Sequence, residues 1–182
     1  SKPKVDLDKL RKWKQSIIKK LNDGIAGLCK KKNVTFIKGR AYIEETHLLR
    51  VETEAGQQFI SFENAIIATG SQPALPATFD LGNKRIMTST EALELEEVPK
   101  KMVVVGGGYI GMELGSVYAS LGSKVTVIEA MSGILAGADQ DLIRPVMAVA
   151  KENFESLIFN AKVSKMATKG KQIEVNYAVD GK

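Results

Sequence analysis

Three glycines in the second half of the chain, Gly106, Gly108 and Gly111, have the spacing G-x-G-x-x-G of dinucleotide-binding turns. The spacing alone is a weak signal, because glycine-rich turns are common. Here it follows an apolar run that ends at Val105, opens a helical pattern, and precedes an acidic residue, Glu129, at the end of the next apolar run. Together these features predict a strand, a phosphate-binding turn, a helix and a second strand.

Each of these residue types has a physical reason for its position. Gly106 permits a tight strand-to-helix turn, Gly108 lets the backbone approach a pyrophosphate, and Gly111 lets the helix pack closely against the strands. The helix N-terminus presents unpaired N–H groups and a positive dipole end to the phosphates. Glu129 can accept hydrogen bonds from the hydroxyls of an adenosine ribose, whereas a 2′-phosphate would meet a like charge. The pattern favours NAD over NADP, and a glycine-rich turn without a ligand is the less favoured interpretation.

Three side chains beside the turn have two interpretations each. Glu113 either meets the positive end of the helix or reaches the nicotinamide end of the cofactor. Tyr109 and Ile110 either line the nicotinamide site or cover the core. Elsewhere, the only histidine, His47, lies beside a predicted turn, and the only cysteine, Cys29, has no partner for a disulfide. No base, nucleophile and orienting group can therefore be assembled from the sequence.

The first 72 residues combine a helical pattern with short strand patterns. Apolar residues recur at steps of three and four from Leu7, with Asp6 as N-cap, and predict an amphipathic helix. Gly24 and Gly27 within it mark either close packing or an early end. Short alternating runs separated by turn residues then predict an antiparallel meander and one further strand. The predicted strands span residues 34–37, 41–43, 48–51, 59–62 and 65–68.

Residues 73–98 contain Pro73 and Pro76 and little periodicity, apart from a short helical pattern over residues 90–95. They are interpreted as a linker, because the composition changes again near Pro99. The predicted organisation is a first domain over residues 1–72, a linker over 73–98, and an incomplete second domain over 99–182.

The second domain alternates strands and helices. Its predicted elements are strand 102–105, helix 109–121 with Gly122 as C-cap, strand 125–129, helix 141–153, strand 157–163 and a hairpin closed near 169–171. Pro145 must lie in the first turn of its helix or kink it. A doubly wound domain should continue beyond the last strand and the Gly-Lys turn that ends at Lys182. The predicted fold class is α/β, a Rossmann-like βαβ unit after a helix and an antiparallel meander.

The composition is that of a soluble globular protein, with 44% hydrophobic and 26% charged residues. No apolar run approaches the roughly 18 residues of a membrane span. The charged first residues lack the apolar stretch of a secretory signal, so a cytoplasmic location is expected. The net charge of +5 comes largely from lysines and arginines in the first 40 residues, interpreted as a solvated helix face. Nucleic-acid binding is less favoured, because few aromatic residues are interleaved with these cations.

Three segments together resemble the dihydrolipoamide dehydrogenases within the pyridine-nucleotide disulfide oxidoreductases. The segments are AIIATGSQP, STEALELEEVP and GGGYIGMELGSVYASLGSKVTVIE, and the resemblance extends through essentially the whole chain. It implies a homodimeric enzyme that transfers electrons from dihydrolipoamide through a redox disulfide and FAD to NAD. Such an enzyme serves 2-oxoacid dehydrogenase complexes, with a lipoyl domain as substrate, and the glycine cleavage system.

The resemblance also implies roles for individual residues. Glu129 would bind the adenosine ribose, Val163 would meet the adenine through its backbone, and Glu113 would approach the flavin and nicotinamide. Two further segments would bind FAD, through the backbone of Ala41 and through an Ala-Thr-Gly motif that includes Thr69 and Gly70. The cofactor-binding residues of the glycine turn are Gly106, Gly107, Gly108, Tyr109, Ile110 and Gly111.

Several motifs of these enzymes are absent from the 182 residues. These are the first dinucleotide motif for FAD, the C-x-x-x-x-C redox pair and the C-terminal His-Glu pair. We therefore expect an internal piece of such an enzyme, proteolytic or engineered, that is inactive by itself. Two alternatives stay open: a stand-alone NAD-binding module without catalysis, and a basic domain that docks on acidic partners through its lysine-rich helix.

Overall fold

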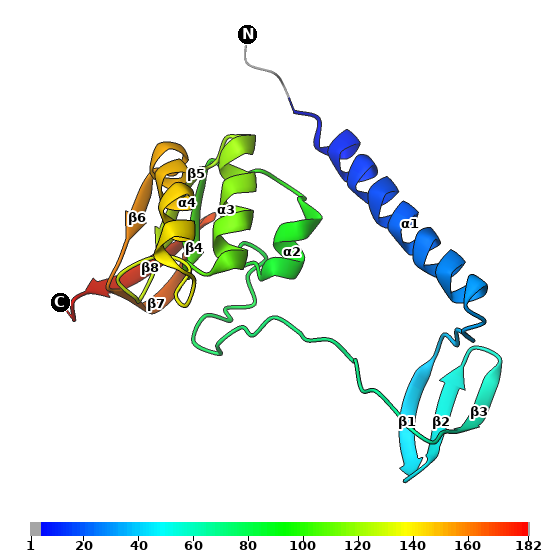
Figure 1. Ribbon diagram of the computed structural model, residues 1–182. Helices are drawn as coiled ribbons and strands as arrows, with labels where there is room; N and C mark the ends of the chain where they lie inside the picture. The colour runs from blue at the N-terminus through cyan, green and yellow to red at the C-terminus, as the bar shows by residue number, and fades with distance from the viewer. Residues whose placement is uncertain (1–4, 182) are drawn as a thin grey trace. The chain divides into compact units, whose positions relative to one another are not determined.

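The computed structural model describes residues 5–181 (Figure 1). Residues 1–4 and Lys182, on which the predictions about export and the last turn partly depend, lie outside the described residues. The chain forms two compact units. One is Lys12–Gln72, and the other contains the described residues up to Arg11 and those from Pro73 on. No helix among the described residues is long and apolar enough to cross a membrane.

The first helix, α1 (Leu7–Lys31), begins as predicted, because Oδ1 of Asp6 accepts a hydrogen bond from the backbone N–H of Lys9 at 3.1 Å. The helix continues through Gly24 and Gly27, where an added Cβ would meet nothing within 4 Å. Both interpretations of these glycines, close packing and an early helix end, are therefore wrong. No side chain of α1 is buried, and Trp13 is 62% exposed.

A three-stranded antiparallel meander follows the helix, as predicted. It consists of β1 (Arg40–Glu45), β2 (Leu48–Thr53) and β3 (Gly56–Ser61), with β2 in the middle. The predicted strands over 34–37 and 65–68 are wrong, because both segments lie outside any helix or strand. A strand needs a neighbour for its backbone hydrogen bonds, and neither segment pairs with another described strand. Ile66 is accordingly 94% exposed.

The second unit contains a parallel sheet in the order β4–β5–β6. Its elements are α2 (Ser89–Glu94), β4 (Lys101–Val105), α3 (Tyr109–Leu121), β5 (Lys124–Ile128), α4 (Gln140–Asn153) and β6 (Ser156–Ile158). Gly122 ends α3 with a φ of 109°, which confirms the predicted C-cap. Pro145 lies inside α4, which continues past it as one helix. The predicted Rossmann-like βαβ unit is confirmed.

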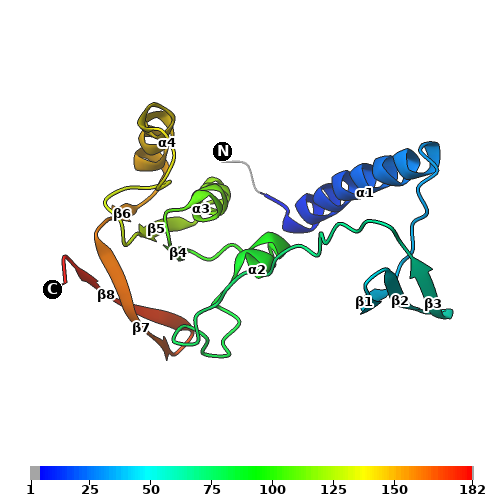
Figure 2. The same cartoon turned by 60° about the horizontal axis from the view of Figure 1, so that its bottom comes forward.

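The predicted strand over 157–163 divides into two strands in different sheets. Asn160 has a φ of 51°, and this left-handed residue separates β6 from β7 (Ala161–Lys169). β7 pairs in antiparallel fashion with β8 (Gln172–Val179), and Gly170, with a φ of 60°, lies in the predicted hairpin turn. Figure 2 shows α3 and α4 on one side of the β4–β5–β6 sheet and the β7–β8 hairpin on the other.

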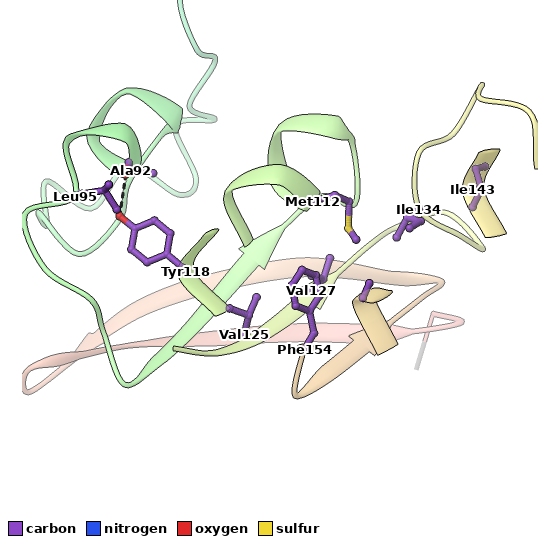
Figure 3. Close-up of a cluster of buried hydrophobic side chains, with 10 residues drawn as sticks. Ala92, Leu95, Met112, Tyr118, Val125, Val127, Ile134, Ile143 and Phe154 are labelled. Atoms are coloured by element: carbon purple, nitrogen blue, oxygen red, sulfur yellow. Dashed lines mark hydrogen bonds between the residues drawn. The ribbon is translucent and has the colours of Figure 1, made fainter. Parts of the chain in front are cut away.

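The core of this unit lies between the parallel sheet and its two helices (Figure 3). Val125 and Val127 of β5 are fully buried beneath α3 and α4. Ala92 and Leu95 of the segment interpreted as a linker also belong to this core. The buried phenol of Tyr118 donates a hydrogen bond to the backbone carbonyl of Ala92 at 2.9 Å. Residues 89–95 are therefore packed against the parallel-sheet unit, and the division into domains at 72 and 98 stays a prediction.

Candidate nucleotide-binding site

The glycine turn joins β4 to the N-terminus of α3. Gly106 has a φ of 105°, and its backbone N–H donates to the carbonyl of Ile128 at 2.9 Å, which ties the turn to β5. Gly108 is the N-cap of α3, and no described side chain caps this helix end. A Cβ at Gly108 would meet nothing within 4 Å, so this side of the turn is open to a ligand. The helix end therefore offers N–H groups and a positive dipole to an anion.

Gly111 has the packing role that its position in the pattern predicts. A Cβ there would lie 2.3 Å from the carbonyl oxygen of Gly106 and 3.0 Å from Cγ1 of Val104. Such distances are too short for any side chain, so α3 can approach β4 this closely only with glycine at the position. The close approach fixes where the N-terminus of α3 points.

Glu129 is fixed at the end of β5 by its backbone and by its side chain. Its N–H donates to the carbonyl of Ile158 at 2.8 Å, and its carbonyl accepts from the N–H of Ala161 at 3.0 Å. The carboxylate accepts from two backbone N–H groups, that of Gly107 to Oε2 at 2.5 Å and that of Met131 to Oε1 at 2.6 Å. A carboxylate has about four lone-pair sites, so each oxygen retains one for a ribose hydroxyl.

Two hollows of similar size lie beside this carboxylate, and Glu129 lines both. The first, of about 270 Å³, is lined by Phe79, Val105, Gly106, Ile128, Glu129, Ala130, Ala161, Lys162 and Val163. The second, of about 280 Å³, is lined by Gly108, Tyr109, Glu129, Leu135, Ala136 and Ala138. The first hollow reaches β7, while the second lies at the N-terminus of α3. Both lie at the carboxyl ends of the parallel strands, where nucleotides bind in open α/β sheets.

The structure brings together only part of the predicted site. The glycine turn, Glu129 and Val163 surround the two hollows, and Tyr109 lines the second one. Tyr109 is 69% exposed and Ile110 is also exposed, so the interpretation that they cover the core is wrong. Glu113 is exposed on α3 and, like Ile110, lines neither hollow.

The three residues predicted for FAD lie in the other compact unit, Lys12–Gln72. Ala41 is on β1, whereas Thr69 and Gly70 are in a segment without helix or strand. All three are exposed. The described residues do not enclose these three positions. The sequence motif is therefore the only support for a flavin site in this part of the described chain.

Sequence reasoning missed several residues of the site. Phe79 comes from the segment interpreted as a linker, and no periodicity or motif marked it. Leu135 follows β5, and its N–H donates to the carbonyl of Gly107 at 2.8 Å, which holds the loop against the glycine turn. Gly107 itself had no physical role in the prediction. A Cβ there would lie 3.2 Å from Oε2 of Glu129 and 3.2 Å from Cγ2 of Ile134.

Residues 2–182 match the pyridine nucleotide-disulphide oxidoreductase family, and this match covers almost the whole chain. The chain belongs to that family. Among curated relatives, the dihydrolipoyl dehydrogenase of Staphylococcus aureus is 40% identical over 177 residues, which are 97% of this chain and 38% of that protein. The dihydrolipoyl dehydrogenase of Geobacillus stearothermophilus is also 40% identical, over 97% of this chain and 37% of its own length. The chain thus spans less than two fifths of these relatives.

Two solved structures agree with the fold. The HOCl-induced flavoprotein disulfide reductase RclA of Escherichia coli matches with a TM-score of 0.79 at 30% identity, over 95% of this chain and 40% of that chain. LpdA of Mycobacterium tuberculosis matches with a TM-score of 0.83 over 96% of this chain and 40% of that chain. At 23% sequence identity, this match supports similarity of fold only. The family and its dihydrolipoyl dehydrogenase members point to FAD and NAD as cofactors.

Proposed function

We propose that residues 99–182 are the NAD-binding part of a dihydrolipoyl dehydrogenase, that residues 1–72 belong to its FAD-binding domain, and that residues 73–98 link the two. The NAD site consists of the glycine turn Gly106–Gly111, with Glu129 for the adenosine ribose and the backbone of Val163 for the adenine. Glu113 and Ile110 extend the site toward the nicotinamide, together with Tyr109. Ala41, Thr69 and Gly70 are the corresponding positions for FAD.

A single arrangement supports this proposal most strongly. The carboxylate of Glu129 is held by the N–H groups of Gly107 and Met131 between two hollows, next to an open helix N-terminus. In the proposed site, an acceptor for ribose hydroxyls lies beside donors for phosphate, which is the order that a dinucleotide requires. Because the acceptor is a carboxylate, a 2′-phosphate would meet a like charge, which favours NAD over NADP.

When bound, NAD supplies a nicotinamide that accepts a hydride. The described residues contribute binding and orientation to this chemistry. The N-terminus of α3 attracts the phosphates, Glu129 orients the ribose, and the apolar wall at Val163 excludes water from the base.

Titration of the chain with NADH and NADPH, followed by calorimetry, tests the proposal. We expect NADH to bind about tenfold or more tightly than NADPH, because like-charge contacts cost several kcal/mol. Gly108→Val should abolish binding of both, since its side chain fills the space that the pyrophosphate needs. Glu129→Ala should weaken NADH binding and reduce the preference between the two ligands.

Two matched variants serve as controls for this titration. Gly27→Val and Glu63→Ala change the same residue types at exposed positions in the other compact unit, and they should leave both affinities unchanged. Equal affinities of the unaltered chain for NADH and NADPH, or unaltered binding by Gly108→Val, would contradict the proposed site.

The activity of the whole protein is part of the same proposal. It oxidises dihydrolipoamide carried on a lipoyl domain, with hydride transfer through flavin to NAD, as a cytoplasmic homodimer within 2-oxoacid dehydrogenase complexes. The 182 residues contain one cysteine, Cys29, and cannot form a redox disulfide within themselves. We therefore expect no oxidation of dihydrolipoamide by this chain, and NAD-dependent oxidation of dihydrolipoamide by any longer product of its gene that carries a cysteine pair.

A second candidate is a stand-alone NAD-binding module without catalysis. The observation that favours it is that the glycine turn, Glu129 and both hollows lie within one compact unit. Both candidates predict the same NADH titration. They differ in the natural reading frame, which on the first proposal continues on both sides of these residues and encodes the cysteine pair.

A further inference from the structure

The hollow beside Glu129 that reaches β7 has one wall that does not come from the βαβ unit or the β7–β8 hairpin. Phe79 supplies this wall from the segment between Pro73 and α2. Its half-buried ring packs against a small cluster formed by Ile128, Ala161 and Val163. The lining of the hollow thus combines aliphatic side chains with one aromatic ring.

The segment that carries Phe79 is held in place by several hydrogen bonds. The N–H of Phe79 donates to the carbonyl of Pro76 at 2.8 Å, which forms a turn at the ring itself. Farther along, Nδ2 of Asn83 donates to Oγ1 of Thr168 at 3.1 Å, which ties the segment to β7. The segment is therefore tied to β7 at a position four residues beyond the aromatic ring.

We propose that Phe79 is a binding residue for the adenine ring of the dinucleotide, which enters the hollow and stacks on the open face of its side chain, beside the aliphatic side chains of Ile128 and Val163. This inference rests on the proposed NAD site and deepens it. A flat base has two π-faces that need cover, and base–aromatic stacking is a favourable and sequence-tolerant contact. The carboxylate of Glu129 at the rim of the same hollow is where the attached ribose must lie.

Each half of the cofactor can be titrated separately to test this assignment. The probes are NADH, 5′-AMP, which contains only the adenosine half, and reduced nicotinamide mononucleotide, which lacks it. We expect Phe79→Ala to weaken both NADH and 5′-AMP roughly five- to a hundredfold. Binding of reduced nicotinamide mononucleotide should be unchanged.

Two further variants separate stacking from packing. Phe79→Leu retains the apolar contacts with Ile128 and Val163, so it should keep the thermal stability of the unaltered chain and still weaken 5′-AMP. Phe59→Ala removes an exposed phenylalanine of β3 in the other unit and should change neither affinity.

The outcomes distinguish this inference from the proposed function. If Phe79→Ala and Phe79→Leu bind 5′-AMP like the unaltered chain while Gly108→Val loses NADH, the assignment of Phe79 is overturned and the NAD site stands. If the unaltered chain binds neither NADH nor 5′-AMP, the proposed function and the assignment of Phe79 are overturned together.

Discussion

The two compact units both have apolar periodicities in their sequences but very different cores. In Lys12–Gln72, Val51 is the only buried apolar side chain among the described residues, and Ile66 is almost fully exposed. In the unit from Pro73 on, two helices and a parallel sheet bury a continuous cluster that includes Val125, Val127 and Tyr118. An apolar pattern indicates a helix or strand, whereas burial of its side chains depends on whether a complementary face is present.

The largest expected difference concerns two isoleucines. Ile134 is 2% exposed in the core of the parallel-sheet unit, so Ile134→Ala should lower the free energy of unfolding by about 2–5 kcal/mol. Ile66→Ala, at a residue that is 94% exposed, should change it by less than about 0.5 kcal/mol. Urea denaturation monitored by circular dichroism measures both. Similar losses for the two variants would show that Lys12–Gln72 has a core of its own.

Two helical glycines should respond to alanine with opposite signs. Gly111→Ala places a Cβ against the carbonyl of Gly106 and should destabilise the parallel-sheet unit by about 1–3 kcal/mol. Gly24→Ala adds a methyl group in open space and should stabilise α1 by about 1 kcal/mol. Thermal melting of the two variants gives the sign directly. A stabilised Gly111→Ala variant would contradict the close seating of α3 on β4.

The smallest expected effect depends on pH and concerns Tyr118. Burial, and then the charge of Glu97, raise the pKa of its phenol above the usual value of 10.0. The folded state therefore holds the proton more tightly, so the stabilisation is fully present below about pH 10 and is lost as the pH rises through the folded pKa. Tyr118→Phe leaves the carbonyl of Ala92 without its donor and should cost about 1–2 kcal/mol at neutral pH.

Unfolding of the unaltered chain and of Tyr118→Phe at several pH values tests this prediction. The difference in unfolding free energy between the unaltered chain and Tyr118→Phe, measured from pH 8 to 11, should shrink at the alkaline end. A difference that stays constant across this range would show that the phenol titrates alike in the folded and unfolded states.

Much of the fold followed from local patterns. The helix over α1, the meander, the glycine turn and α3 were predicted from periodicity, capping residues and turn residues, because each depends on neighbours close in sequence. The strand over 157–163 was placed correctly but divides at Asn160, whose left-handed conformation no pattern announced. The predicted strands over 34–37 and 65–68 were wrong. Both segments have the apolar pattern of a strand, but neither has a neighbouring described strand to pair with.

Short-range spacing along the chain predicted the family, the βαβ order and the positions where a dinucleotide would meet glycine and Glu129. Two features emerge in three dimensions alone: Gly107 and Met131 hold the carboxylate of Glu129, and Phe79 lines the adjacent hollow. Gly107 lies 22 positions before Glu129 in the sequence, and Phe79 lies farther still from it. The physical cause of both features is the parallel pairing of β4 with β5 and the return of β7 beside them, which local sequence patterns do not contain.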